Sequence, residues 1–232
     1  MVISHKHKFI FIHIPKCAGN TICYSLLNNL YFDTKNDIFN LNAYKDRKNK
    51  VLNYTYLNTN TAQVFKNVKN QGNSTGLKQH DKLKKLKDYL NKKNLNINDY
   101  FKFSFMRNPW ARRVSQHQFA KKLAKINKGG KWAAKISKMS FYEFITKRND
   151  SQLNWVSDEK DNIAVDFLGS SKNLQNEFNF VCEKIGISRI HLPHRNVTKH
   201  KHYTEYYDDE TRQIVAEKCA KDIEYFNYKF GE

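Results

Sequence analysis

The hydrophobic positions of the chain alternate between short continuous runs and helical periods. Phe9–Ile14 is an apolar, β-rich run that Pro15 ends, and runs of this kind are typical of strands buried on both faces of a parallel sheet. From Thr21 onward the apolar positions fall at helical spacing, which makes residues 15–20 a loop between a strand and a helix. The chain therefore begins with a predicted strand–loop–helix unit.

Two further strands and several helices are predicted after this unit. Tyr100–Met106 has Phe at alternate positions, as a buried strand does, and residues 163–168 are a third strand candidate. Helix starts are predicted near Asp81, at Pro109 behind the cap Asn108, at Phe141 behind Ser140, near Leu174, and after Asp208. Strands that alternate with helices predict an α/β fold whose central, mainly parallel sheet is flanked by helices.

The length of 232 residues fits one domain with a sizeable core. We find no internal repeat and no linker, and therefore predict a single domain over residues 1–232. Residues 31–74 and 121–137 have the least interpretable patterns, and we expect insertions or loops there.

Composition restricts the partners more than the fold. The 41 Lys and Arg against 22 Asp and Glu give a net charge of +19, which attracts phosphate, sulfate, nucleic acid or acidic polysaccharide. The hydrophobic content of 40% is too high for a disordered basic tail. The four Cys lack zinc-site spacing and disulfide-scaffold density, which predicts reduced thiols. The N-terminal apolar run is too short for a signal peptide or a membrane span, so we expect a soluble, cytoplasmic chain without an anchor.

The segment Ile14-Pro-Lys-Cys-Ala-Gly-Asn-Thr21 carries most of the chemical information. A loop between a parallel strand and a helix directs free backbone N–H groups and the positive helix end at one spot, where an anion binds. Lys16 adds a charge, Gly19 allows close approach of the backbone, and Thr21 supplies a hydroxyl. The segment lacks the Walker A pattern, and no magnesium-binding Asp is evident, which disfavours an ordinary ATPase.

This loop resembles the 5'-phosphosulfate loop of the carbohydrate sulfotransferases, which transfer a sulfuryl group from 3'-phosphoadenosine 5'-phosphosulfate (PAPS). Phe105-Met-Arg-Asn-Pro-Trp-Ala-Arg-Arg-Val-Ser115 resembles the 3'-phosphate motif of the same family. Weaker similarity covers nearly all of the chain outside residues 31–74, through Phe167–Gly169, Asn173–Phe178, Leu192–Asn196 and Asp222–Tyr228. The resemblance implies a P-loop-like α/β domain that transfers a sulfuryl group from PAPS to a carbohydrate hydroxyl.

The resemblance also implies which residues bind the cofactor. The 5'-phosphosulfate would contact Lys16, Cys17, Ala18, Gly19, Asn20 and Thr21, and the 3'-phosphate would contact Arg107 and Ser115. Both motifs follow predicted parallel strands, at the sheet edge where open α/β folds bind ligands. Arg112 would either reach the nucleotide or pair with an acidic side chain. Asn196 and Lys199 are weaker candidates for the nucleotide pocket, and no metal is expected.

Sulfuryl transfer needs a base for the acceptor proton and positive charge on the leaving oxygen. We predict Lys16 as the electrophile and His80 as the base, since family members place a base His in a similar segment after the first motif. His13 lies inside the first strand, where a hydrogen-bonded core residue is expected. The His cluster between residues 191 and 202 lacks Cys or carboxylate partners at ligand spacing, so we interpret it as a basic loop.

Some features are open to other interpretations. Lys172 stands where relatives often carry Glu, which puts an acidic role at that position in doubt. The other interpretations concern a lysine set and three tryptophans. A solvated helix face is favoured over guidance of an anionic acceptor for Lys84, Lys85, Lys87, Lys92 and Lys93. A packed aromatic is favoured over stacking on a sugar ring or adenine for Trp110, Trp132 and Trp155.

Two other functions fit the charge or the loop: a basic nucleic-acid-binding protein, and a nucleotide kinase with an atypical phosphate loop that would need magnesium. We instead expect the partner to be a glycan or polysaccharide acceptor and not a nucleic acid. The positive charge of the protein would suit an anionic acceptor. Residues 31–74 and 121–137 would then form its acceptor-side loops. The acceptor itself and the oligomeric state are not readable from the sequence.

Overall fold

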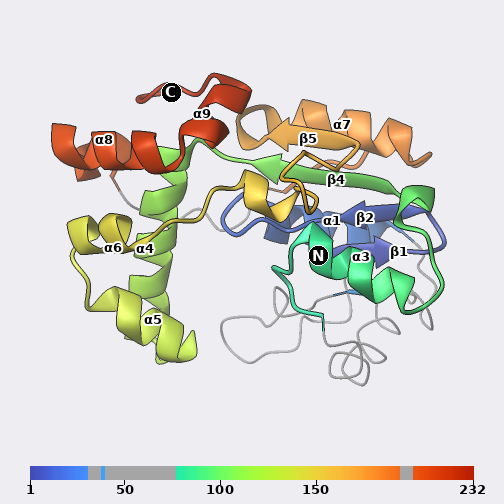
Figure 1. Cartoon of the computed structure of the whole chain (residues 1–232), viewed down its shortest axis with the longest axis horizontal. Coiled ribbons are helices and arrows are strands. Elements are labelled where there is room, and N and C mark those ends of the chain that lie inside the picture. Colours follow the sequence, from blue (N-terminus) through green and yellow to red (C-terminus); the bar gives the residue numbers. More distant parts are fainter. Residues whose placement is uncertain (31–37, 40–76, 194–200) are drawn as a thin grey trace. The chain divides into compact units, whose positions relative to one another are not determined.

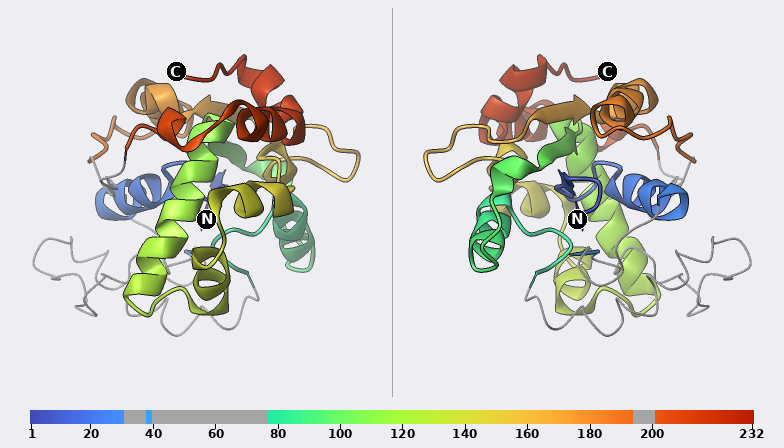
Figure 2. Two further views of the ribbon diagram at one scale, coloured as in Figure 1. Left: turned by 90° about the vertical axis from the view of Figure 1, so that its left-hand side faces the viewer. Right: turned by 90° about the vertical axis from the view of Figure 1, so that its right-hand side faces the viewer.

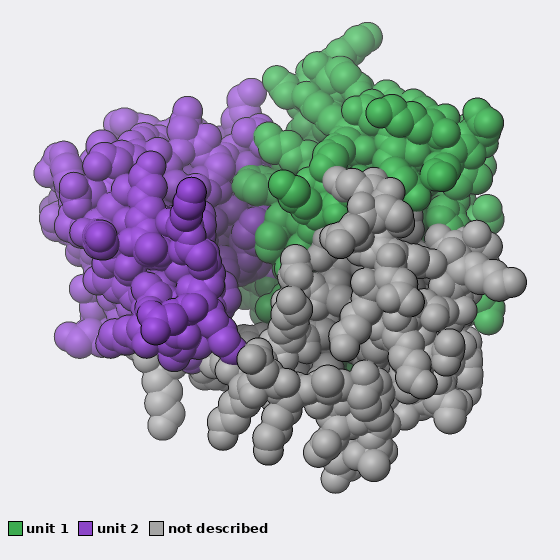
Figure 3. All heavy atoms as spheres, turned by 90° about the horizontal axis from the view of Figure 1, so that it is seen from below, with its two compact units in different colours: residues 1–14, 18–106, 155–195 green, residues 15–17, 107–154, 196–232 purple. Residues whose placement is uncertain are grey.

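A computed structural model describes residues 1–30, 38–39, 77–193 and 201–232. The chain divides into two compact units, coloured in Figure 3, which are described separately. The first unit contains residues 1–14, 18–106 and 155–195, and the second contains residues 15–17, 107–154 and 196–232. The single domain over residues 1–232 stays a prediction, because compactness is not a test of independent folding.

Within the described residues of the first unit, five short strands form one sheet in the order β3-β1-β2-β4-β5 (Figure 1). The strands are β1 (Val2–Ser4), β2 (Phe9–Phe11), β3 (Ile38–Phe39), β4 (Phe101–Met106) and β5 (Phe167–Ser170). β4 is parallel to both β2 and β5, whereas β1 runs antiparallel to β2 and β3. The predicted α/β class is confirmed, with the parallel pairs between β2, β4 and β5.

Two of the predicted strands have different bounds in the structure, and two strands, β1 and β3, were missed. β2 ends at Phe11, although the Ile12 N–H still donates to the Phe103 carbonyl at 2.9 Å. β5 begins at Phe167, because Ile163 forms an isolated bridge with Ser157 instead. β1 has only three residues, too few for a period to be recognised in the sequence.

Three helices of the first unit were predicted: α1 (Gly19–Asn29), α3 (Leu83–Asn91) and α7 (Leu174–Lys184). α1 begins two residues earlier than predicted, so Gly19 and Asn20 belong to the helix and not to the loop. α7 packs against β5, as Figure 1 shows. Side chains of α1, β4 and α7 meet in one buried cluster that includes Ile22, Leu26, Phe103, Phe105 and Phe178. Apolar burial of this kind is the main stabilising contribution to such a unit.

The second unit is helical in its described part (Figure 2). Its helices are α4 (Pro109–Lys125), α5 (Gly130–Ser137), α6 (Phe141–Lys147), α8 (Asp209–Lys218) and α9 (Ala220–Phe226). The predicted caps are confirmed: Asn108 accepts from the N–H groups of Trp110 and Ala111, and Asp208 accepts from Thr211. Ser140 and Glu143 form the predicted capping box.

The segment 121–137, expected as an insertion or loop, is mostly helical. Residues 121–125 complete α4, and α5 begins at Gly130. Alanine and lysine have high helix propensity, while Gly129 and Gly130 have φ of 84° and 55° and form the turn between the helices. Whether this helical hairpin lies on the side of an acceptor stays a prediction.

Candidate functional site

Two residues of the loop before α1 have a left-handed backbone. Lys16 has φ 72° and Ala18 has φ 58°, a conformation that costs a non-glycine residue about 1–3 kcal/mol. Strain of this kind collects at ligand-binding turns. The sequence contained no signal for it, because neither position is a glycine or an asparagine. The loop also passes from one unit to the other, since Pro15–Cys17 belong to the second unit and Ala18 to the first.

The first turn of α1 has neither a side-chain cap nor an acidic residue. Ala18, the N-cap, has no polar side-chain atom, and its carbonyl accepts from the Thr21 N–H at 2.9 Å. Helix N-termini present backbone N–H groups and the positive end of the helix dipole, both of which an anion can satisfy. The loop that the sequence predicts to bind an anion thus leads into a helix that no side chain of its own caps.

Gly19 lies directly under the imidazole ring of His13. A Cβ atom at Gly19 would be 2.0 Å from Cδ2 of His13, which is far inside van der Waals contact. The sequence predicts that Gly19 allows an anion to approach the backbone closely, whereas in the structure the close neighbour of Gly19 is the His13 ring. His13 is buried and its Nδ1 lies 3.1 Å from Nε2 of Gln79, so it is the hydrogen-bonded core residue that the sequence predicted.

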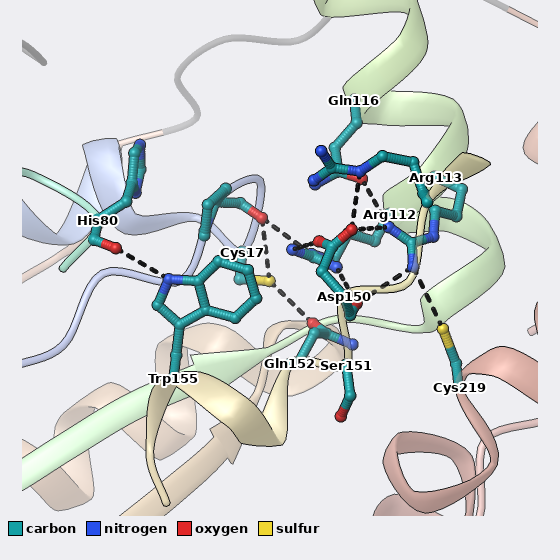
Figure 4. Close-up of polar contacts among 12 residues, drawn as sticks. Cys17, His80, Arg112, Arg113, Gln116, Asp150, Ser151, Gln152, Trp155 and Cys219 are labelled. Carbon is teal, nitrogen blue, oxygen red and sulfur yellow. Dashed lines mark hydrogen bonds and ion pairs between the residues drawn. The ribbon is translucent and has the colours of Figure 1, made fainter. Parts of the chain in front are cut away.

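His80 is exposed, and its ring and its backbone carbonyl each form a hydrogen bond. Its Nδ1 donates to the His13 carbonyl at 2.8 Å, because a carbonyl oxygen can only accept. The His80 carbonyl in turn accepts from Nε1 of Trp155 at 3.0 Å (Figure 4). With the proton on Nδ1, the neutral ring has its basic lone pair on Nε2.

The Lys16 ammonium lies over an aromatic ring of α4. Its Nζ is 3.9 Å from the centroid of Phe119, a distance at which the face of the ring attracts a cation. Sequence reasoning missed Phe119, because nothing in the sequence indicates that these two residues meet.

The Cys17 side chain points into the protein. Only 1% of Cys17 is exposed, and its Sγ–H donates to Oε1 of Gln152 at 3.0 Å (Figure 4). Burial raises the pKa of this thiol to about 11, so the thiol is protonated at neutral pH. At the predicted cofactor site, Cys17 can therefore contribute its backbone but not a thiolate.

Gln152 also holds both peptide groups of Arg107. Its Oε1 accepts from the Arg107 N–H at 2.9 Å, and its Nε2 donates to the Arg107 carbonyl at 2.8 Å. The Arg107 guanidinium makes no hydrogen bond or ion pair with the residues that the structure describes. Because the group is partly buried, its pKa is lowered from the usual value. Gln152 was missed by sequence reasoning, since a lone Gln in a polar segment carries no signal.

Two arginines of α4, unlike Arg107, form ion pairs with an acidic side chain. Arg112 and Arg113 are almost fully buried, and their guanidinium groups contact Asp150 at 3.1 Å and 2.7 Å (Figure 4). Burial opposes ionisation of Asp150, but Arg113, Arg112 and Arg148 together lower its pKa to about 2. Of the two roles left open for Arg112, the structure contains the ion pair. Arg112 also donates from Nε to the Pro15 carbonyl at 3.0 Å, which ties the loop to α4.

The structure describes only some of the remaining predicted site residues. Ser115 is buried on α4, and Asn20 accepts from Nε2 of Gln79 at 3.2 Å. Asn196 and Lys199 lie outside the described residues, as do His194 and His200 of the predicted basic loop.

The sequence assigns the lysines of α3 to the surface and two tryptophans to the interior. Lys85 of α3 is exposed and Lys84 and Lys87 are half-buried, and the three pair with Asp81, Asp161 and Glu159 respectively. Trp110 is buried, as predicted, and donates to the Arg212 carbonyl at 3.0 Å. The prediction was wrong for Trp132, which is 43% exposed because the short helix α5 turns its buried face, at Ala133 and Ile136, away from that position.

The described residues contain no group of three or more His, Cys, Asp or Glu side chains that could hold a metal ion. In the same part of the chain, no helix has the length and apolar character needed to cross a membrane. The cytoplasmic location expected from the sequence stays a prediction.

The fold and the loop together define the class of the protein: an α/β protein with a P-loop-like strand–loop–helix unit whose helix has no side-chain cap. The family model described as the sulfotransferase family matches residues 1–229, and the chain belongs to this family. The predicted resemblance is thereby confirmed. Searches of curated proteins and of solved structures found no match.

Proposed function

We propose that this protein transfers a sulfuryl group from PAPS to a hydroxyl of a carbohydrate acceptor. Membership of the sulfotransferase family supports sulfuryl transfer, and the donor and the acceptor are what the proposal adds. Residues 16–21 would bind the 5'-phosphosulfate, and Arg107 and Ser115 would bind the 3'-phosphate. Asn196 and Lys199 remain weaker candidates, and Arg112 would act by holding the Pro15 carbonyl.

The observation that supports the proposal most directly is the positive charge of the Arg107 guanidinium, which forms no ion pair with the described residues. A cation that is partly removed from water needs an anion or hydrogen-bond acceptors close by. Arg112 and Arg113 have Asp150, whereas the described residues offer the Arg107 guanidinium no such partner. A 3'-phosphate would supply the missing charge through a bidentate contact, and it would distinguish PAPS from ATP.

The test is the thermal stability of the protein with 3'-phosphoadenosine 5'-phosphate, compared with ATP and AMP. At about 100 times its Kd, a ligand stabilises the folded state by roughly 2.7 kcal/mol, which raises the Tm by several degrees. We expect the 3'-phosphorylated nucleotide to stabilise selectively, and Arg107→Ala to abolish that selectivity. Arg189→Ala is the matched control, because Arg189 is exposed and already paired with Glu183. Equal stabilisation by all three nucleotides would contradict the proposal.

In the proposed reaction, the acceptor oxygen attacks sulfur in line with the bond to the leaving phosphate oxygen, and that bond breaks as the new one forms. The hydroxyl proton goes to His80, whose Nδ1 hydrogen bond to the His13 carbonyl supports Nε2 as the basic nitrogen. Lys16 offsets the charge that develops on the leaving oxygen. No metal is part of the proposal, since a sulfuryl group carries less negative charge than a phosphoryl group.

An anionic acceptor is supported by the charges between β4 and α6. Residues 100–142 contain no Asp or Glu, whereas residues 121–138 contain seven Lys. Lys131, Lys135 and Lys138 are exposed and follow one another at helical spacing, so they lie on one face formed by α5 and its C-cap, Lys138. None of the three forms an ion pair with the described residues, in contrast to the lysines of α3. Trp132, exposed beside them, has a ring that could stack on a sugar.

The two alternative functions predict different responses. A nucleotide kinase with an atypical phosphate loop would require magnesium and would bind ATP without the 3'-phosphate. A basic nucleic-acid-binding protein would be stabilised by DNA or RNA and not by mononucleotides.

A further inference from the structure

We propose that Gln152 is a positioning residue that sets the geometry between the two phosphate-binding segments, acting through the Arg107 backbone and the Cys17 thiol. The inference deepens the proposed function, because it concerns the same nucleotide site. It assigns a role to a residue that no family motif singled out.

The Gln152 amide uses its full hydrogen-bonding capacity. Gln152 is 0% exposed. Its Oε1 accepts from Cys17 Sγ at 3.0 Å and from Arg107 N at 2.9 Å. Its Nε2 donates to the Arg107 carbonyl at 2.8 Å and to Oδ2 of Asp222 at 3.3 Å. An amide has two donor hydrogens and two acceptor lone pairs, so these four contacts determine a single orientation of the side chain.

The two segments that meet at Gln152 are those predicted for opposite ends of the nucleotide. Arg107 carries the guanidinium proposed for the 3'-phosphate, and both of its peptide groups are bound by this one amide. Cys17 follows Lys16 in the loop proposed for the 5'-phosphosulfate. Since a misplacement of about 1 Å can cost about 100-fold in rate, a common anchor for both segments determines whether one nucleotide can satisfy both.

Asp222, in α9, in turn holds Gln152. Its Oδ2 accepts from the Gln152 N–H at 2.7 Å, and its Oδ1 accepts from Ser151 Oγ at 2.5 Å and from the Leu153 N–H at 3.1 Å. Asp222 is 0% exposed, and among the described residues it has no hydrogen bond to Arg107 or Cys17. Among the hydrogen bonds of the described residues, its link to the Arg107 and Cys17 segments therefore runs through Gln152. The segment Asp222–Tyr228, which is weakly similar to the family, thereby has a structural role.

The experiment measures the Kd of 3'-phosphoadenosine 5'-phosphate and of AMP for each variant by titration calorimetry. The Kd of AMP divided by the Kd of 3'-phosphoadenosine 5'-phosphate reports the contribution of the 3'-phosphate alone, and a general loss of stability does not change this ratio. Gln152→Met keeps the approximate volume and removes all four hydrogen bonds, and we expect the ratio to fall about tenfold. Asp222→Asn should lower the ratio less, in the same direction.

Ser151→Ala is the matched control, because it removes a hydrogen bond to Asp222 but leaves both contacts of Gln152 with Asp222 in place. Its ratio should equal that of the wild type. A wild-type protein that does not discriminate between the nucleotides overturns the proposed function itself. A discriminating wild type whose ratio is unchanged in Gln152→Met and in Asp222→Asn overturns the role of Gln152. If Gln152→Met does not fold, the ratio of Asp222→Asn decides.

Discussion

A single hydrogen bond prepares His80 for the role proposed for it. Because the His13 carbonyl accepts from Nδ1, the neutral imidazole has Nε2 as its acceptor. The His13 carbonyl belongs to the residue whose ring covers Gly19, so one residue shortly after β2 contacts both the start of α1 and the proposed base. The sequence suggested His80 by analogy alone, and the tautomer required a neighbour that only the fold brings close.

We expect His80→Ala to lower the rate of sulfuryl transfer by about 10²–10⁴-fold and to leave the Kd of 3'-phosphoadenosine 5'-phosphate unchanged. The reason is that the base contacts the acceptor proton and not the nucleotide. Single-turnover transfer assays together with calorimetry measure the two quantities separately. His191→Ala, at an exposed position of the predicted basic loop, is the control and should keep full activity. Full activity of His80→Ala would exclude His80 as the base.

Among the helices, α4 is joined by ion pairs to the segment that precedes Gln152. Arg112 and Arg113, on α4, share the carboxylate of Asp150 with Arg148. This arrangement determines where Arg107 can lie, because Arg107 comes directly before the cap of α4. The helix itself could be predicted from Asn108 and Pro109, but its ionic anchor could not, since the sequence does not reveal which acid meets two buried arginines.

We expect Asp150→Asn to lower the free energy of unfolding by about 3 kcal/mol at neutral pH, because it leaves buried guanidinium groups without their counter-charge. The folded-state pKa of Asp150, about 2, lies below the ordinary value of 3.8. Its stabilising contribution is therefore present above the ordinary value and is lost as the pH falls toward 2. Urea unfolding at several pH values should show the difference between wild type and variant shrinking as the pH falls below about 4.

The control for this measurement is Asp161→Asn, since Asp161 pairs with Lys84 at an exposed position. Exposed pairs contribute less than about 1 kcal/mol. A cost for Asp150→Asn no larger than that of the control would mean that the buried ion pairs do not stabilise α4.

At the scale of the whole molecule, the net charge of +19 is unevenly compensated. The lysines of α3 have acidic partners, whereas residues 100–142 contain no acid at all. An excess of one sign on one surface attracts a charged partner over a distance and loses strength as salt is added. Among the described residues, Lys131, Lys135 and Lys138 form no ion pair, and their charge would therefore act on the anionic acceptor proposed above.

We expect the triple substitution of Lys131, Lys135 and Lys138 to Gln to raise the KM for an anionic polysaccharide about tenfold at low salt, from roughly 0.5 kcal/mol for each lost charge. kcat and the affinity for nucleotide should not change. Substituting Lys84, Lys85 and Lys87 to Gln removes the same charge from α3 and serves as the control. If both triple variants raise KM equally, net charge rather than the position of α5 determines acceptor binding.

Most of the helices, the strands of the parallel pairs and the strand–loop–helix unit at the start of the chain could be predicted from the sequence, because they depend on local features. Hydrophobic periods, the cap at Asn108 and the loop between Pro15 and Thr21 are contained in short stretches of chain. The anchoring of the site was decided only by the tertiary structure. The contacts of Gln152 with Arg107, of Asp150 with α4 and of His13 with Gly19 mostly join residues far apart in the sequence. The role of a buried polar group depends on the partners that form its hydrogen bonds, and the fold decides which partners those are.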